Sequence, residues 1–132
     1  MSPFEVIRGP GVPKSALPFS PALRVGDFVF LSGFASVDED GKIIHDTFEI
    51  EVRRTYQVVG KVLAAAGLNF SHVVQVRAYL GKQEYWDQHN LIYREFFREP
   101  FPARTTLVGC LGDLVKYEAD LVAYSGKILK PS

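Results

Sequence analysis

The stretch that decides the fold of this chain is residues 101–124, which read FPARTTLVGCLGDLVKYEADLVAY. It holds two short apolar runs, residues 105–110 and 115–124, on either side of the turn-forming pair Gly112-Asp113. Two such runs joined by a turn are typical of an antiparallel hairpin. The sequence therefore predicts two strands that pair directly with each other.

Charged side chains interrupt this apolar stretch. Arg104 opens the first run, and Glu118 and Asp120 lie two apart in the second, hence on one face of a strand. A buried charge is costly unless it is paired or used. Arg104 could form an ion pair with Glu118 or Asp120, or it could grip a substrate carboxylate with two hydrogen bonds. Glu118 could face solvent, or it could be partly buried with a raised pKa and transfer protons.

Helical spacing of apolar residues marks two segments outside this stretch, residues 46–67 and 83–98. Asp46 with Glu49 three residues later fits a capping box, which places the start of the first helix at Asp46. Pro100 lies just beyond the second segment, where a helix must end. We therefore expect two amphipathic helices.

Strand patterns fill most of the remaining chain, at residues 4–7, 28–35 and 73–80. The second of these is apolar on both faces, and the third alternates, with Val74 among the residues of its buried face. Residues 9–22 carry four prolines and are expected to form an ordered loop.

This order of elements predicts an α+β fold, with a mixed sheet and two helices packed on one of its faces. The other face is too apolar to face water, which favours an oligomer that buries it. Residues 1–132 are expected to form a single domain, with 127–132 as a tail.

Composition narrows the possible partners. Lys+Arg and Asp+Glu both number 15 among 132 residues, so no basic field exists to attract nucleic acid or an anionic membrane. His45, His72 and His89 show no metal-ligand spacing and are expected on the surface or on a helix face. Cys110, the single cysteine, is expected to be a buried, inert thiol. No signal peptide or membrane span is visible, which favours a cytoplasmic protein.

Five motifs together resemble the Rid family, the reactive intermediate deaminases named for RidA. They lie at residues 24–33, 62–67, 90–97, 101–107 and 116–120. Each motif is weak alone, but their order and spacing are specific, and the resemblance covers most of the chain. It implies a chorismate-mutase-like protomer and a homotrimer, with sheets forming a central barrel, helices outside and active sites between subunits.

The resemblance also implies a cofactor-free hydrolytic deaminase that converts reactive 2-enamino or 2-imino acids, such as 2-aminoacrylate, to 2-keto acids and ammonia. By motif, Arg104 would bind the substrate carboxylate, and Glu118 would position or activate water. Both would face one interfacial cleft. Further substrate-binding positions would be Phe19, Ser32, Gly33, Asn90 and Thr106. No metal ligands are implied.

The sequence departs from the best-known deaminases at two of these positions. Thr106 replaces a cysteine, and Phe19 replaces a tyrosine of the early pocket loop. Two alternatives follow. The substrate could be a larger enamine acid such as 2-aminomuconate, or the protein could be a non-catalytic trimer that binds small carboxylates.

Overall fold

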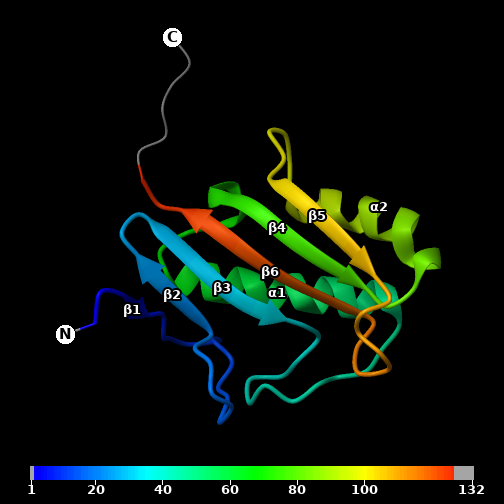
Figure 1. The fold of residues 1–132 in the computed structure, drawn as a ribbon, viewed down its shortest axis with the longest axis horizontal. Helices are drawn as coiled ribbons and strands as arrows, with labels where there is room; N and C mark the ends of the chain where they lie inside the picture. The colour runs from blue at the N-terminus through cyan, green and yellow to red at the C-terminus, as the bar shows by residue number, and fades with distance from the viewer. Residues whose placement is uncertain (1, 127–132) are drawn as a thin grey trace.

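A computed structural model describes residues 2–126, and within them the chain forms one mixed six-stranded sheet backed by two α-helices (Figure 1). The elements in chain order are β1 (Glu5–Val6), β2 (Ala22–Val25), β3 (Phe28–Phe34), α1 (Phe48–Ala65), the 3₁₀ turn η1 (Phe70–His72), β4 (Val73–Leu80), the 3₁₀ turn η2 (Gln83–Tyr85), α2 (Trp86–Phe96), β5 (Ala103–Val108) and β6 (Tyr117–Tyr124). Met1 and the predicted tail at residues 127–132 lie outside the described residues.

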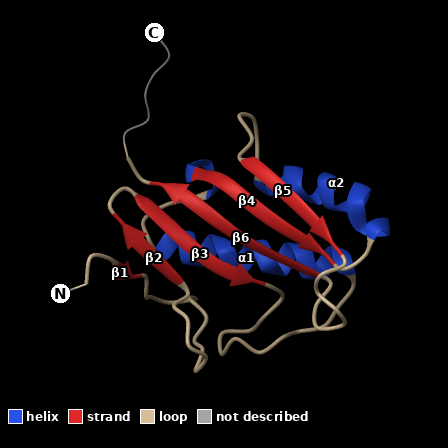
Figure 2. Cartoon of the chain, viewed as in Figure 1, coloured by secondary structure: helices blue, strands red, loops and turns tan. Residues whose placement is uncertain are grey.

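Both α-helices pack on the same face of the sheet, which confirms the predicted α+β class (Figure 2). The core lies between these two layers and includes Val52, Val59 and Leu63 of α1, none of them exposed. From the sheet it includes Val76 and Leu121. Because successive strand residues point to opposite faces, alternate residues of β4 and β6 enter this layer.

The strand order is β1-β2-β3-β6-β4-β5, so the predicted hairpin of residues 105–110 with 115–124 is wrong. β6 lies between β3 and β4 and runs antiparallel to both, while β5 pairs with β4 in parallel. Every second residue of β6 is buried, whereas no residue of β5 is. The better-buried strand takes the centre, and the crossover through α2 brings β5 to the edge.

A strand that the sequence patterns missed, β2, pairs with β3 through a tight turn at Gly26-Asp27. Gly26 has φ +57°, the left-handed region that favours glycine. Pro21 immediately before β2 concealed the strand, because the proline-rich segment indicated loop.

Helix α1 begins one residue later than the predicted capping box allows. Thr47 is the N-cap, and its side chain accepts a hydrogen bond from the Ile50 backbone N–H at 3.3 Å. Asp46 instead accepts a hydrogen bond from the Thr47 N–H at 2.8 Å. The predicted Asp46–Glu49 box is therefore wrong, and a hydroxyl one residue further on does the capping.

Two local predictions of burial are also wrong. A register shift between Val73 and Gln75 turns Val74 outward, so Val73 and Val76 are buried in its place. Such a bulge moves side chains to the other face. Cys110 is exposed, because β5 ends at Val108 and the cysteine falls in the loop beyond it.

The sheet face opposite the helices carries large apolar side chains with little cover. Phe28, Phe30 and Leu107 are 42%, 45% and 49% exposed, and outward-turned Val74 is 43% exposed. In the described part of the chain no helix covers this face of the sheet (Figure 2). The oligomer that would cover this face stays a prediction.

A polar cluster is buried between α2 and the sheet. His89 Nε2 and the Tyr117 hydroxyl share a hydrogen bond of 2.9 Å, and Tyr117 is also hydrogen-bonded to the Tyr56 hydroxyl. Burial, with the nearby charge of Arg104 as the smaller cause, lowers the pKa of His89 from 6.5 to about 4. His89 is therefore a neutral core residue at neutral pH, although its sequence position suggested a surface or helix face.

The buried histidine should make stability depend on pH. Unfolded His89 takes up a proton near pH 6.5 and the folded residue only near pH 4, so the free energy of unfolding falls as the pH drops between these values. The loss is on the order of 3 kcal/mol. Urea unfolding of the parent, His89→Gln and the exposed control His45→Gln, at one protein concentration, measures it. Only His89→Gln should flatten the profile; an unchanged slope would contradict the assignment.

Candidate functional site

Two cavities lie beside the predicted site residues. One, of about 560 Å³, is lined by Glu118, Gly33 and Phe19, among others. The second, of about 270 Å³, is lined by Arg104 and Asn90 with Tyr93, Arg94, Phe101 and Pro102. The structure thus divides five of the seven predicted site residues between two cavities, and Ser32 and Thr106 line neither.

The Glu118 carboxylate lies close to the backbone of β3 at Gly33. A β-carbon added at Gly33 would lie 3.0 Å from Glu118 Oε2, so this glycine makes room for the carboxylate. The register of β3 against β6 shifts between Leu31 and Phe34, where three steps on β3 match two on β6. This bulge lies beside the carboxylate and re-aims the backbone around it.

The Glu118 carboxylate is half-buried, and in residues 2–126 no side-chain hydrogen bond or ion pair reaches it. Asp120, on the same face, is held by Arg77 Nε at 2.7 Å and by the Tyr79 hydroxyl at 2.8 Å. Burial, and to a lesser degree the charge of Asp120, raises the pKa of Glu118. A carboxyl group with a raised pKa exchanges protons more readily near neutral pH.

Ser32 and Phe19 have different places around this cavity. The Ser32 hydroxyl donates to the Ser20 carbonyl at 2.5 Å, and the Ser32 N–H donates to the Pro21 carbonyl at 3.0 Å. These bonds fasten the proline-rich loop to β3. Phe19, on that loop, lines the cavity and is 52% exposed. Ser32 thus supports the loop, and Phe19 provides part of the wall.

Arg104 is held by helix α2. Its Nη2 donates to Asn90 Oδ1 at 2.8 Å, and its guanidinium lies 4.7 Å from the centroid of the Tyr93 ring. Tyr93 in turn stacks on Phe97, with centroids 4.5 Å apart. In the described residues Arg104 contacts neither Glu118 nor Asp120 as an ion pair, so that interpretation of the sequence is wrong. The sequence pattern places Tyr93 only within the predicted amphipathic helix at residues 83–98 and gives it no role beside Arg104.

Thr106 follows Arg104 by two positions on β5 and shares its face. It aligns with the buried Ala78 of β4, as Arg104 aligns with buried Val76. Both therefore project toward the helix layer. Thr106 lines neither cavity.

Arg104 and Glu118 project from opposite faces of the sheet. Glu118 aligns with Tyr79 of β4, next to buried Ala78, and so points away from the helices. Strand β4 also separates β5 from β6. A single chain therefore does not bring the two residues to one ligand.

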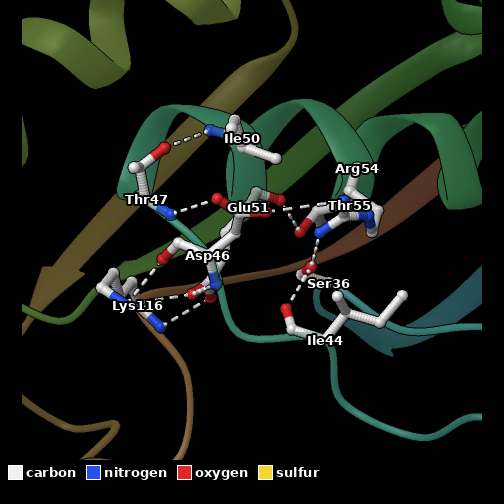
Figure 3. A network of polar contacts seen from close by, with 9 residues as sticks. All are labelled: Ser36, Ile44, Asp46, Thr47, Ile50, Glu51, Arg54, Thr55 and Lys116. Carbon is white, nitrogen blue, oxygen red and sulfur yellow. Dashed lines mark hydrogen bonds and ion pairs between the residues drawn. The ribbon is translucent and has the colours of Figure 1, made fainter.

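A polar network that the sequence analysis missed fixes the chain just before Glu118 (Figure 3). Glu51 of α1 is fully buried and accepts hydrogen bonds from the backbone N–H groups of Asp46 and Lys116, at 3.1 and 3.0 Å. Lys116 Nζ lies 3.3 Å from the same carboxylate. An acidic residue within the apolar stripe of a helix was the available signal.

Among residues 2–126, no group of three His, Cys, Asp or Glu side chains gathers in a way that could hold a metal ion. None of the helices in this part of the chain combines the length and apolar character needed to cross a membrane.

Comparison with known proteins gives the family of this chain. The family model described as Endoribonuclease L-PSP matches residues 11–125. A RutC family protein of Pyrococcus abyssi is 33% identical over 122 residues, covering 91% of this chain and 96% of that protein. A 2-iminobutanoate/2-iminopropanoate deaminase of Dermatophagoides farinae is 31% identical and covers 81% of this chain and 84% of its own.

The solved structures give the same family. YyfA of Yersinia pestis, a Rid protein of unknown function, has a TM-score of 0.84 at 25% identity, covering 92% of this chain and 98% of that one. The chain belongs to the Endoribonuclease L-PSP family, which includes the reactive intermediate deaminases. The resemblance seen in the five sequence motifs is confirmed.

The raised pKa of Glu118 is directly testable. Replacing Asp120 with Asn removes a negative charge from the same sheet face, so the pKa of Glu118 should fall, while burial, the larger cause, keeps it above its ordinary value. NMR titration of ¹³C-labelled glutamate carboxyl groups measures this, with Asp113→Asn in the exposed turn as control. A Glu118 pKa that stays constant or rises in Asp120→Asn would contradict the assigned cause.

Proposed function

We propose that this protein is a hydrolytic deaminase of 2-imino and 2-enamino acids. The observation that carries the proposal is a cation, Arg104, and a carboxyl group, Glu118, that each line a cavity and form no ion pair within the described residues. Arg104 is oriented by Asn90 and Tyr93, which leaves N–H groups for a carboxylate. Relatives of 28% and 31% identity carry the name of imine deaminases, which supports this reaction.

The proposal requires a second copy of the chain. Because Arg104 and Glu118 project from opposite sheet faces, the Arg104 pocket of one copy would meet the Glu118 cavity of the next. Arg104 lies on β5, an edge strand, where a neighbour can approach. The apolar open face around Phe28 and Phe30 supports self-association. We infer a homotrimer, as the family resemblance implies, with one site at each interface.

In the proposed reaction the Arg104 guanidinium binds the substrate carboxylate and fixes the C=N bond near Glu118. An enamine first gains a proton at carbon and becomes the iminium ion. Glu118 accepts a proton from water while the water oxygen bonds to C2, and the C=N electron pair moves to nitrogen. The resulting carbinolamine takes that proton back from Glu118 on nitrogen. Its C–N bond then breaks as the hydroxyl becomes the ketone C=O, and the hydroxyl proton passes to the departing ammonia, so that a 2-keto acid and ammonium leave.

The reaction needs the protein only to position the substrate and to supply one group that carries a proton. Hydrolysis leaves the oxidation state of the substrate unchanged, so we expect no redox cofactor to take part. A carboxyl group with a raised pKa suits both halves of the proton transfer. Such imines also react with water unaided, so a barrier reduction of a few kcal/mol would suffice.

Substitutions at the two charged residues test the mechanism. Arg104→Ala should lower kcat/KM by about 10²-fold, and Arg104→Lys by less, because lysine keeps the charge but not the paired N–H groups. Glu118→Gln should lower kcat by about 10²-fold or more. The assay generates imino acids with an amino acid oxidase or a serine dehydratase and follows keto acid release above the spontaneous rate.

The exposed controls Arg98→Ala and Glu84→Gln should match the parent. Full activity in Arg104→Ala would refute the mechanism. If no imino acid reacts faster than in water, while keto acids still raise the melting temperature, the protein is a binding protein instead.

The proposed assembly has its own test. Phe30→Glu places a charge on the apolar open face and should convert the trimer to monomers, with loss of activity because each site needs two copies. Leu91→Glu, on a 69% exposed residue of α2, is the matched control and should stay trimeric. Light scattering coupled to size-exclusion chromatography gives the masses. A monomeric parent, or an active monomeric variant, would disprove the interfacial site.

A further inference from the structure

We infer that the cavity beside Glu118 selects 2-imino acids with a bulky apolar side chain, of the size found in leucine, methionine or phenylalanine, over those with one or two side-chain carbons. The inference rests on the proposed function, because it assigns this cavity to the substrate's side chain. The reaction is unchanged: water adds at C2, and ammonium leaves.

The volume of the cavity is the first argument. At about 560 Å³ it lies within the range of roughly 300–1,000 Å³ typical of pockets that enclose drug-sized ligands. The carboxylate of the substrate would sit on Arg104, outside this cavity. A methyl or ethyl side chain would leave most of the space to water, whereas a branched or aromatic one would fill it.

The character of the wall is the second argument. Leu17 and Phe19 of the proline-rich loop and Leu114 of the turn before β6 line the cavity and are 64%, 52% and 62% exposed. Large apolar side chains gathered at one opening favour an apolar partner. Buried Val115 continues the same wall beside Leu114. An apolar side chain beyond C2 would therefore be taken out of water on this wall.

The charged side chains that line the cavity are not expected to bind the side chain of the substrate. Glu118 lies beside Gly33, where the reaction is proposed to occur. Lys14 donates its backbone N–H to the Glu39 carbonyl at 3.1 Å, so it lies beside the loop that follows β3. Arg8 is the other cation of the lining. Both cations are exposed, so water already solvates them, and an ion pair with a second substrate carboxylate would add less than burial of an apolar side chain.

The wall is also held in place before any ligand arrives. Ser32 donates both its hydroxyl and its N–H to carbonyls of the loop that carries Phe19, and the Phe19 N–H donates to the Leu17 carbonyl at 2.8 Å. A preformed wall lowers the entropic cost of binding, so its apolar area contributes more fully to selectivity.

The test compares imino acids made in place by amino acid oxidases from L-leucine, L-phenylalanine, L-alanine and L-glutamate. Each buried methylene strengthens binding several-fold, so kcat/KM for the leucine-derived imine should exceed that for the alanine-derived imine by at least about tenfold. Equal values, or a preference for the alanine- or glutamate-derived imine, would overturn the inference and leave the proposed function standing.

Variants of the wall connect the preference to named residues. Leu114→Asp should bring the leucine-to-alanine ratio of kcat/KM down toward one, because a charged, hydrated side chain replaces part of the apolar wall; repulsion of the substrate carboxylate lowers both values alike and leaves the ratio unaffected. Leu91→Asp replaces a leucine on α2 that is 69% exposed, against 62% for Leu114, and should leave the ratio unchanged. A ratio that survives Leu114→Asp would contradict the placement of the side chain against this wall.

Binding separates failure of this inference from failure of the proposed function. Calorimetry with 4-methyl-2-oxopentanoate and with pyruvate measures side-chain preference without turnover. Tighter binding of the larger acid supports the inference even if no imine is hydrolysed, an outcome that would remove only the proposed function. Equal binding of the two acids overturns the inference.

Discussion

The rest of the structure depends on the burial of one face of β6. Tyr117, Ala119, Leu121 and Ala123 are 0–1% exposed, and each lies between the sheet and the helices. A strand so completely buried on one side must be central, so it pairs with β3 and β4 rather than with the strand that precedes it. The opposite face of the same strand carries Glu118 and Asp120, whose positions follow from that burial.

This arrangement separates the two charges that proximity in the sequence suggested were partners. Arg104 faces the helices, where Asn90 and Tyr93 orient it, and Glu118 faces away from them. An ion pair within the chain would have satisfied both charges and left neither free for a ligand. The fold prevents that pairing. The two unpaired charges have a use if a second copy of the chain brings Arg104 and Glu118 to one substrate.

Much of the fold could be predicted from periodicity, because helix burial and strand alternation are local properties. Periodicity predicts helix α1 and strand β4, and the family motifs mark Arg104 and Glu118 as candidate site residues. The pairing of β6 could not be found, because turn signals report chain reversal and not which strand is nearest. The bulge at Val74 is a local change of register that apolar alternation does not show. Asp46 and Thr47 are both favoured N-cap residues, so residue preference alone does not decide that Thr47 accepts the capping hydrogen bond.

The environment of Glu118 shows how an ordinary acid acquires a useful pKa in such a fold. The bulge in β3 and the absent side chain of Gly33 bring backbone against the carboxylate, which removes water from it. Arg77 and Tyr79 are hydrogen-bond donors on the same sheet face as Glu118, and both are held by Asp120. Asp120 therefore acts twice, since it occupies the available donors and adds a negative charge of its own. Both effects favour the protonated form of Glu118, the state in which an acid can return a proton to a departing amine.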